Sequence, residues 1–550
     1  MLSLFSSNRL LIPFFCALWA FACEGPPTAY EAEVRSNYIA HLELEGSTLV
    51  ATTLVEDLES PWEISWGPDD HLWLSEQNGT VSRVDPETGA RKVILQVSDV
   101  HYQKSRGLLG MDVHPRLTEK PYVFLHYTFL VPNPEMRKII YSRLVRYVWD
   151  GDTLTRPHIL LDSIPGNTFH NGSRILVTED DKVFLSTGDA GHLDHVQDPE
   201  QLEGKILRLN VDGSIPADNP IPGNPAWSWG HRNAQGLVMV GDRLYASEHG
   251  PATDDEVNLI EAGNNYGWPD VHGFCDRPKE KEYCTAHGIT EPLFAWTPTV
   301  AAAGLDYYDN PAVPEWRNSL LLTNLKGQAL RVLRLSEDGS RVEEEKVYFQ
   351  KFFGRLRDIC VAENGDLFLA TSNTDWHPRL QAFMYDTASL IKPHDDRIIR
   401  LRPADARTKD LVAGLDQTVP LREDSVILEL DSEQWVASVD GNTIELGQNI
   451  YDAQCALCHR PDGKGVKELY PPLAGTSWVT GSKDRLIATV LRGLSDPIEV
   501  NGETYQEQMP AYTMLSDEEI AAVLTFIRKQ WGNDAGPVRP AEVAEERRVL

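Results

Sequence analysis

The feature that most constrains the fold is a recurring pair of short apolar runs joined by a tight polar turn, seen four times between residues 45 and 405. Alternating apolar residues around turns rich in Asp, Asn and Gly predict β-hairpins. Hairpins that repeat over this length without helical periodicity favour a six-bladed β-propeller over a β-sandwich, the alternative all-β fold. The clearest pairs are Ile64–Trp66 with Leu72–Leu74, Ile175–Val177 with Val183–Leu185, Leu237–Met239 with Leu244–Ala246, and Ile359–Val361 with Leu367–Leu369.

Near the C-terminus, the sequence CALCH at 455–459 has the CxxCH pattern that attaches a c-type haem. The sulfur atoms of Cys455 and Cys458 would bond covalently to the haem, and His459 would be the proximal ligand of its iron. Half of a zinc site is the alternative, but structural zinc needs further paired ligands, and residues 445–532 contain no other cysteine. This module is therefore predicted to be a small all-α cytochrome c domain.

The ends of the chain and the segment between the two modules carry different signals. Residues 1–22 combine Arg9 with a following apolar run too short to span a bilayer, which predicts a signal peptide and export to the periplasm. Cys23 follows directly, so a lipid anchor at this residue is an open alternative. Residues 406–444 are expected to be a connector, and residues 533–550 a polar tail.

Composition narrows the class of partner. The formal net charge of −31 predicts neither nucleic-acid binding nor attraction to an anionic membrane, although some of the carboxylates could hold divalent cations.

In an exported protein, Cys275 and Cys284, which lie in a polar loop, can form a disulfide. Cys360 lies in an apolar, strand-like run and is expected to be a buried thiol.

Motifs in the propeller region resemble, by their number, order and spacing, those of the soluble quinone-dependent glucose and sorbosone dehydrogenases. The resemblance covers about residues 50–400 and is strongest over 166–330. The matching motifs are RGLLG at 106–110, HNGSR at 170–174, GD at 188–189, GHRNAQGL at 230–237, EHGP at 248–251, DDE at 254–256, NYGWP at 265–269, Lys326, and RLRD at 355–358.

The C-terminal module resembles class I cytochrome c, in which the second iron ligand comes from a loop before the last helix. The sequence Met509-Pro510-Ala511 matches that loop, so the resemblance implies Met509, rather than Met514, as the distal ligand. A thioether is a soft ligand that suits the sixth position of a low-spin haem and raises its potential.

The propeller resemblance implies an enzyme that uses pyrroloquinoline quinone (PQQ), a cofactor whose three carboxylates require cations. Arginine suits this task because its planar guanidinium binds a carboxylate through two parallel hydrogen bonds. Each loop arginine taken alone would be read as a surface ion pair, but the order of the motifs favours cofactor binding. The residues at the matching positions are Arg232, Lys326, Arg355 and Arg357, with Asn233 as a neutral donor.

The same resemblance assigns the catalytic roles to three residues. His170 matches the general base that takes the hydroxyl proton of the substrate as hydride leaves the neighbouring carbon. Asp189 matches the carboxylate that orients this histidine and raises its basicity. Arg232 would help to stabilise the charge that develops during the reaction.

Two calcium sites are also implied. At the quinone, the backbone carbonyls of Gly250 and Pro251 would bind an ion that polarises the reacting carbonyl, and hard oxygen ligands suit calcium. A second, structural ion would lie near the loop that contains Cys275 and Cys284. Its ligands would come from Glu256, Tyr266, His272, Phe274, Asp276 and Glu291.

One departure from the family pattern concerns the substrate. Ser105 and Arg106 stand where glucose-oxidising members have a Gln or Glu that contacts the sugar, and Gln103 lies two residues earlier. Glucose is therefore not favoured as the natural substrate. The residues expected to line the mouth of the cavity are Trp227, Trp229, His192 and His195.

These features predict an exported quinohaemoprotein dehydrogenase that oxidises an aldose-like sugar with PQQ and calcium and passes electrons to its fused haem c. The haem would in turn reduce a downstream cytochrome or respiratory oxidase. Two alternatives stay open. The same scaffold could act on a non-sugar alcohol, polyol or aldehyde, or the propeller could be a non-enzymatic binding module that carries an electron-transfer cytochrome.

Overall fold

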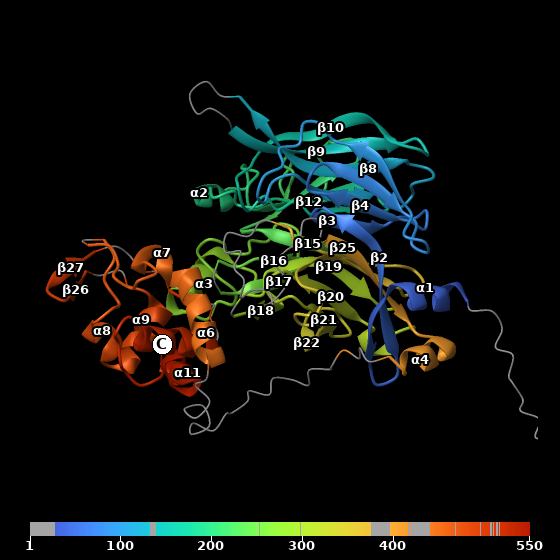
Figure 1. The fold of residues 1–550 in the computed structure, drawn as a ribbon. Coiled ribbons are helices and arrows are strands. Elements are labelled where there is room, and N and C mark those ends of the chain that lie inside the picture. The colour runs from blue at the N-terminus through green and yellow to red at the C-terminus, as the bar shows by residue number, and fades with distance from the viewer. Residues whose placement is uncertain are drawn as a thin grey trace, which may run out of the picture.

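The structure is a computed structural model, drawn in Figure 1, in which a strand-rich part is followed by a smaller helical domain. None of its helices is long and apolar enough to cross a membrane, within the residues described. The expected signal peptide, Cys23 and Met514 lie outside those residues, as does most of the expected connector. The described residues are 28–132, 139–251, 253–297, 299–375, 396–415, 419, 441–467, 469–494, 497–506, 509, 511–512, 515 and 517–549.

The strand-rich part is a six-bladed β-propeller, as predicted, and five of its blades are four-stranded antiparallel sheets built from consecutive strands. Successive residues of a strand point to opposite faces of its sheet, and each face packs against a neighbouring blade. Most of the strands are therefore largely buried. The five blades are β3–β6 (Pro61–Trp66, Leu72–Glu76, Thr80–Val84, Arg91–Gln96), β7–β10 (Leu108–Val113, Tyr122–Val131, Ile139–Trp149, Leu154–Pro165), β11–β14 (Ile175–Val177, Lys182–Ser186, Lys205–Asn210, Ala226–Trp229), β15–β18 (Ala234–Val240, Arg243–Glu248, Asp255–Ile260, Phe294–Trp296) and β19–β22 (Ala302–Tyr308, Ser319–Asn324, Leu330–Leu335, Val342–Tyr348).

The sixth blade joins the two ends of the propeller. Strands β23 (Leu356–Val361), β24 (Leu367–Thr371) and β25 (Asp396–Pro403) are completed by β2 (Thr48–Leu58), with β1 (Tyr38–Glu43) at its edge. In this pairing Leu49 of β2 lies opposite Pro403 of β25. Because strands from both ends of the propeller share one sheet, the ring is held closed by backbone hydrogen bonds.

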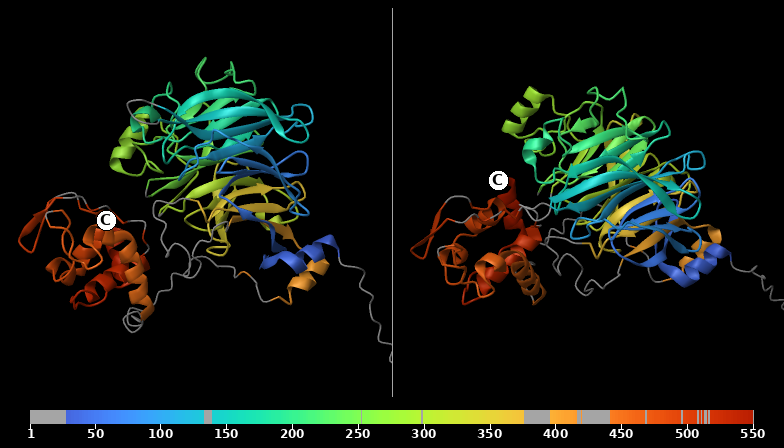
Figure 2. Two further views of the ribbon diagram at one scale, coloured as in Figure 1. Left: turned by 45° about the horizontal axis from the view of Figure 1, so that its top comes forward. Right: turned by 90° about the horizontal axis from the view of Figure 1, so that it is seen from above.

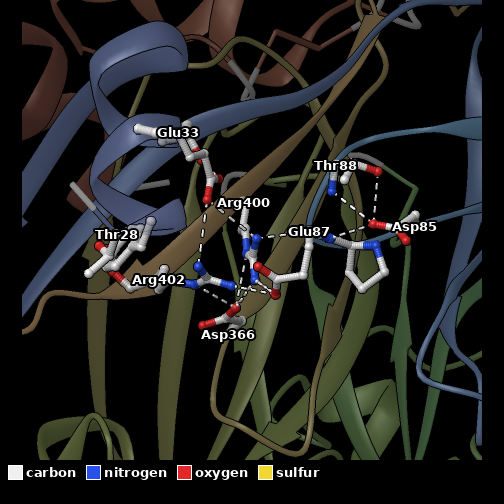
Figure 3. A network of polar contacts seen from close by, with 12 residues as sticks. Thr28, Glu33, Asp85, Glu87, Thr88, Asp366, Arg400 and Arg402 are labelled. Carbon is white, nitrogen blue, oxygen red and sulfur yellow. Dashed lines mark hydrogen bonds and ion pairs between the residues drawn. The ribbon is translucent and has the colours of Figure 1, made fainter. Parts of the chain in front are cut away.

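A buried ion network reinforces this closure (Figure 3). Arg400 and Arg402 of β25 both donate to Asp366 Oδ2, over 2.6 and 2.9 Å. Glu33, on helix α1 (Ala29–Asn37), lies 3.4 Å from the Arg400 guanidinium. The N-terminal helix is thereby tied to the last blade, beside α4 (Ala406–Val412).

The four hairpins predicted from the sequence are confirmed, and each is the first hairpin of its blade. They are the pairs β3–β4, β11–β12, β15–β16 and β23–β24. The disulfide between Cys275 and Cys284 is present, and it clips helix α3 (Pro278–His287) to the loop before it. Cys360 is a buried thiol, as expected.

The C-terminal domain is helical, and it lies at one side of the propeller in both views of Figure 2. One face of α10 (Asp517–Lys529), the longest helix described in this domain, is apolar and buried, with Ile520, Leu524 and Ile527 in a common core. Residues 533–550, expected to be a polar tail, include a helix whose Val543 is buried in that core. The elements are α6 (Gly441–Ile450), a π-helical turn (Tyr451–Cys455), α7 (Ala456–His459), α8 (Ser477–Thr480), α9 (Lys483–Arg492), β26 (Ile498–Val500), β27 (Glu503–Tyr505), α10 (Asp517–Lys529) and α11 (Pro540–Val549).

Candidate active site and haem pocket

A cavity of about 540 Å³ lies among the loops at one end of the propeller blades. The loops that form it precede the first strand of a blade or follow the second, so residues far apart in sequence meet there. The predicted residues that line it are His170, Arg232, Asn233, Gly250, Pro251, Lys326, Arg355 and Arg357. Asp189 lies behind His170, so the predicted catalytic and cofactor residues are brought together.

The pair formed by His170 and Asp189 has the geometry of an oriented base. His170 Nδ1 lies 2.8 Å from Asp189 Oδ1, and the Asp189 side chain is buried. Because a carboxylate only accepts hydrogen bonds, Nδ1 carries the hydrogen and Nε2 keeps its lone pair. Trp268 Nε1 donates to the other oxygen of Asp189 over 3.0 Å, which fixes the plane of the carboxylate.

The electrostatics of the pair favour a neutral imidazole beside an ionised carboxylate. Burial lowers the pKa of His170, and the hydrogen bond to Asp189 offsets only part of that effect. Burial by itself would raise the pKa of Asp189, but the hydrogen bond from His170 holds it below its usual value. At neutral pH His170 is therefore able to accept a proton.

The local backbone explains the glycine that precedes Asp189. His170 has a φ of 53°, in the left-handed region that costs a non-glycine residue roughly 1 kcal/mol. Its carbonyl oxygen packs against Gly188, where an added Cβ would lie only 2.0 Å away. Any side chain at residue 188 would therefore displace His170 from the cavity.

Two arginines form the cationic floor of the cavity, and both are nearly fully buried. Arg355 donates to Asp375 Oδ2 over 3.2 Å, and Arg357 donates to the same oxygen. Arg357 also stacks on Trp62, with its guanidinium carbon 3.9 Å from the ring centroid. Burial lowers the pKa of Arg357 to about 10, so the side chain stays charged at neutral pH. Sequence reasoning missed Asp375 and Trp62.

Several buried donors at the cavity have no hydrogen-bond partner among the described residues. Arg232 Nε, Arg355 Nη1 and Arg357 Nε make no hydrogen bond to any residue that the structure describes. Unpaired buried donors are costly, and three on cationic groups around one cavity fit an anion with several carboxylates. This chemistry matches PQQ, so the donor set fits the cofactor that the sequence implies.

The remaining predicted cofactor residues are held in position by the protein. Lys326 Nζ lies 3.1 Å from the Thr299 hydroxyl, and Asn233 Oδ1 accepts from the Gly172 N–H over 3.1 Å. Asp255 accepts from the Gly250 N–H over 2.7 Å, which fixes the loop that would bind calcium at the quinone. Burial raises the pKa of Asp255 to about 6.

The residues predicted for a structural calcium ion are only partly brought together. Glu256 accepts from the Gly273 N–H and Glu291 accepts from the Cys275 N–H, so both carboxylates reach one loop. Burial and the neighbouring Glu248 raise the pKa of Glu256 to about 8. A bound cation would lower this pKa again. The other predicted ligands lie further out or are engaged elsewhere: Tyr266 donates to Leu259, His272 contacts Pro269, and Phe274 and Asp276 are exposed.

The residues connected with the substrate and those expected at the mouth of the cavity lie in different places. Ser105 lines the cavity, but Arg106 turns back to donate to the Gln103 carbonyl over 2.9 Å. Trp227, Trp229, His192 and His195, which were expected at the mouth, are not among the residues that line the cavity. Trp227 instead packs edge-on against Phe184 inside its blade.

A second, apolar cavity of about 70 Å³ lies in the helical domain. Cys455, His459 and Met509 all line it, so the two predicted iron ligands and one attachment cysteine face the same space. His459 Nδ1 lies 2.8 Å from the Pro471 carbonyl, which only accepts, so His459 Nε2 is the atom available to a metal. The donor set and the apolar walls fit a c-type haem.

The two cavities share a residue that sequence reasoning did not single out. Leu515 of the helical domain lines both the haem pocket and the propeller cavity. Gln454, the neighbour of Cys455, and Glu519 of α10 also line the propeller cavity. One apolar side chain thus forms part of the wall of each site.

Both the propeller and the helical domain resemble known proteins. Residues 58–379 match the family model described as Glucose / Sorbosone dehydrogenase, and residues 444–531 match the model described as Cytochrome c. Quinoprotein glucose dehydrogenase B of Acinetobacter calcoaceticus is 29% identical over 406 residues, covering 58% of this chain and 84% of that protein. Cytochrome c-552 of Thermus thermophilus is 44% identical over 91 residues, covering 16% of this chain and 69% of that protein.

Among solved structures, the PQQ-bound form of an aldose sugar dehydrogenase from Streptomyces coelicolor resembles the propeller. Its sequence is 30% identical, and the match has a TM-score of 0.54 and covers 65% of this chain and 98% of that one. The match spans nearly all of that protein, so the helical C-terminal domain of this chain is an addition to a propeller of similar extent.

Proposed function

Because the chain belongs to the glucose/sorbosone dehydrogenase family and carries a fused cytochrome c domain, we propose that it oxidises an aldose-like sugar with PQQ and calcium and delivers the electrons to its own haem c. We place this activity in the periplasm, with a downstream cytochrome or respiratory oxidase as final acceptor. The observation that carries the proposal is one cavity that contains both an oriented base and unpaired cationic donors.

The protein's own residues would act on the substrate in defined ways. His170 Nε2 takes the proton of the reacting hydroxyl, and Asp189 holds the ring and stabilises the imidazolium that results. PQQ, when bound, would supply an ortho-quinone as the hydride acceptor, and the hydride would come from the carbon that bears the reacting hydroxyl. Arg232 projects beside Trp268, 5.2 Å from the ring centroid, and its charge would stabilise the negative charge that develops in the cavity.

The cationic set would bind and orient the cofactor. Arg355 and Arg357 are neutralised only in part, because both bind one oxygen of the single carboxylate of Asp375. The surplus positive charge is available to carboxylates of the cofactor. Gly250 and Pro251 would supply backbone oxygens to a calcium ion at the quinone.

Electron transfer to the second domain rests on the shared wall. His459 and Met509 would hold the iron, and Cys455 and Cys458 would fix the haem covalently. Leu515 touches both cavities, so cofactors bound in the two sites would lie on either side of one side chain. Because the acceptor is part of the same chain, the first electron transfer would need no diffusive encounter between two molecules.

A non-sugar alcohol, polyol or aldehyde is the second candidate substrate class, and one observation favours it. Arg106 donates to both the backbone carbonyl and the side-chain oxygen of Gln103, so neither side chain presents the contact that glucose-oxidising relatives are expected to use. The reading of the propeller as a binding module without catalysis is the third candidate, and it has to account for the paired His170 and Asp189.

The test is a substrate panel with the haem as the reporter. The full-length protein with haem attached is loaded with PQQ and calcium and offered aldoses, polyols, simple alcohols and aldehydes without added mediator. We expect the haem bands to become reduced with at least one aldose, and His158→Ala, an exposed histidine of β10, to behave like the parent. Reduction by non-sugars alone would select the second candidate, and no reduction by any compound would support the third.

A further inference from the structure

We propose that His192, His195 and Glu203 form a binding site for a divalent transition-metal ion of the zinc class, outside the PQQ cavity. Their ligand atoms lie within 4.8 Å of one another, and this is the one such cluster of His, Cys, Asp and Glu found in the part of the chain that the structure describes. The three residues lie in the short stretch between β12 and β13. His192 directly precedes the short helix α2 (Leu193–Val196), and His195 lies within it.

The geometry converges on one carboxylate. His192 Nδ1 and His195 Nδ1 each lie 2.8 Å from Glu203 Oε1. In a tetrahedral zinc site, bonds of about 2.0–2.2 Å separate neighbouring ligand atoms by roughly 3.3 Å, so a small outward shift of the two rings would admit an ion. The rings are tilted by 54°, with centroids 5.2 Å apart, and do not block each other.

The Glu203 side chain is buried, unlike that of an ordinary surface carboxylate. Its side chain is 1% exposed, whereas those of His192 and His195 are 46% and 38% exposed. Glu203 Oε2 is also buried, and no described residue hydrogen-bonds to it. A buried carboxylate oxygen without a partner is costly, and a bound cation would compensate it while the exposed imidazoles give the ion a path from solvent.

The surrounding chain holds these residues in place. Lys205 is fully buried, and its ammonium donates to the backbone carbonyls of His195 and Glu203. These bonds fix the backbone at both ends of the stretch, so the ligands are preorganised by the groups behind them.

The donor set selects the chemical class of the ion. Two imidazole nitrogens and one carboxylate oxygen suit zinc and neighbouring transition metals, whereas calcium and magnesium prefer sites made only of oxygen. Three protein ligands leave a fourth position for water in a tetrahedral site. The exposed His side of the cluster is where such a water would lie.

The cluster is connected to the catalytic pair through the backbone. The His192 N–H donates to the Asp189 carbonyl over 2.7 Å. Gln197, just after α2, donates to the Trp268 carbonyl over 2.6 Å, and the Trp268 indole in turn donates to Asp189. An ion at the cluster would therefore hold the segment that positions Asp189, without contacting substrate or cofactor.

The experiment measures zinc binding to the full chain with haem attached, so that Cys455, Cys458 and His459 are occupied. Equilibrium dialysis against zinc chloride in excess calcium, followed by metal analysis, is compared for the parent, His192→Ala, His195→Ala and Glu203→Gln. His158→Ala is the matched control because it removes an exposed histidine elsewhere on the propeller. Glu203→Gln keeps the shape of the side chain and guards against an effect of misfolding, which circular dichroism would detect.

We expect about one tightly bound zinc ion per parent chain and an affinity at least about 10²-fold weaker in each cluster variant. X-ray absorption at the zinc edge should show nitrogen and oxygen neighbours only. Equal binding by the parent, the control and the cluster variants would overturn the proposal and leave a hydrogen-bonded trio without metal. Because neither PQQ nor substrate is needed, this result is independent of the proposed dehydrogenase activity.

Discussion

The two domains each contain a histidine whose ring is fixed through Nδ1, and the partner of that nitrogen differs. His170 in the propeller bonds to the carboxylate of Asp189, whereas His459 in the helical domain bonds to the carbonyl of Pro471. Burial lowers the pKa of both imidazoles. In each case Nε2 is the atom left to do chemistry.

The surroundings assign different tasks to these two similar rings. A carboxylate stabilises the imidazolium that forms when His170 accepts a proton, and the cavity beside His170 is lined by arginines whose charge suits an anion. A neutral carbonyl gives no such stabilisation, and His459 faces an apolar slot that suits a metal cofactor. The group bonded to Nδ1 therefore suits His170 to the role of a base and His459 to the role of a metal ligand.

The largest expected effect comes from removing the base. His170→Ala should slow substrate oxidation by about 10²–10⁴-fold, because the hydroxyl proton loses its acceptor. PQQ binding and the haem spectrum should be unchanged, since His170 belongs to neither cation set nor haem pocket. Pre-steady-state haem reduction measures the rate, with His158→Ala as the control. A variant that oxidises substrate at the parental rate would show that His170 is not the base.

The partner of the ring should set the pH dependence. Activity requires neutral His170, so it should fall as pH drops through the pKa of this group, which lies below the usual value of about 6.5. Asp189→Asn removes a hydrogen bond that raises this pKa, so the acid limb should move to lower pH and the plateau rate should fall on the order of 10²-fold. Rate profiles of parent and variant measure both changes. An acid limb that stays in place would break the link between Asp189 and the base.

The cationic floor should affect cofactor affinity more than chemistry. Arg357→Gln removes a buried donor, and loss of a hydrogen bond between charged groups should weaken PQQ binding by about 10–10²-fold. Titration of the haem-containing protein with PQQ measures the affinity. Arg341→Gln, at a side chain that is 72% exposed, is the matched control. Equal affinity in both variants would remove Arg357 from the cofactor site.

The smallest expected effect concerns the haem pocket. Met509→Ala should leave substrate oxidation intact and lower the reduction potential of the haem, because a thioether ligand stabilises the reduced iron. Redox titration of the haem bands in the parent and the variant measures the shift. An unchanged potential and spectrum would exclude Met509 as the distal ligand.

Sequence reasoning found the blades whose first hairpin has a short turn, such as β3–β4, and overlooked those in which it is long. Strands β7 and β8 are separated by residues 114–121, and β19 and β20 by residues 309–318, so the local turn signal is absent. The pairing of β2 with β25 joins segments more than 300 residues apart and leaves no local trace. The burial of α11 was hidden because, among the residues described in this mostly polar stretch, Val538 and Val543 are the ones that enter the core.

At the site, motif order was enough to place His170, Asp189 and the arginines in or beside one cavity. It did not reveal Asp375, which stands near Arg355 and Arg357 only because β23 and β24 pair. It also gave His192 and His195 a place at the cavity mouth, whereas both turn toward Glu203. Side-chain direction within a loop is set by contacts that the local sequence does not encode.

The central claim is that the haem is the internal acceptor of the dehydrogenase, and rapid mixing tests it most directly. The full chain with haem, PQQ and calcium is mixed with a substrate identified by the panel, and haem reduction is followed over a range of protein concentrations. We expect a rate constant that is independent of protein concentration, because the electrons cross the wall that contains Leu515 within one molecule. A rate proportional to protein concentration would contradict it, because electrons would then pass between molecules.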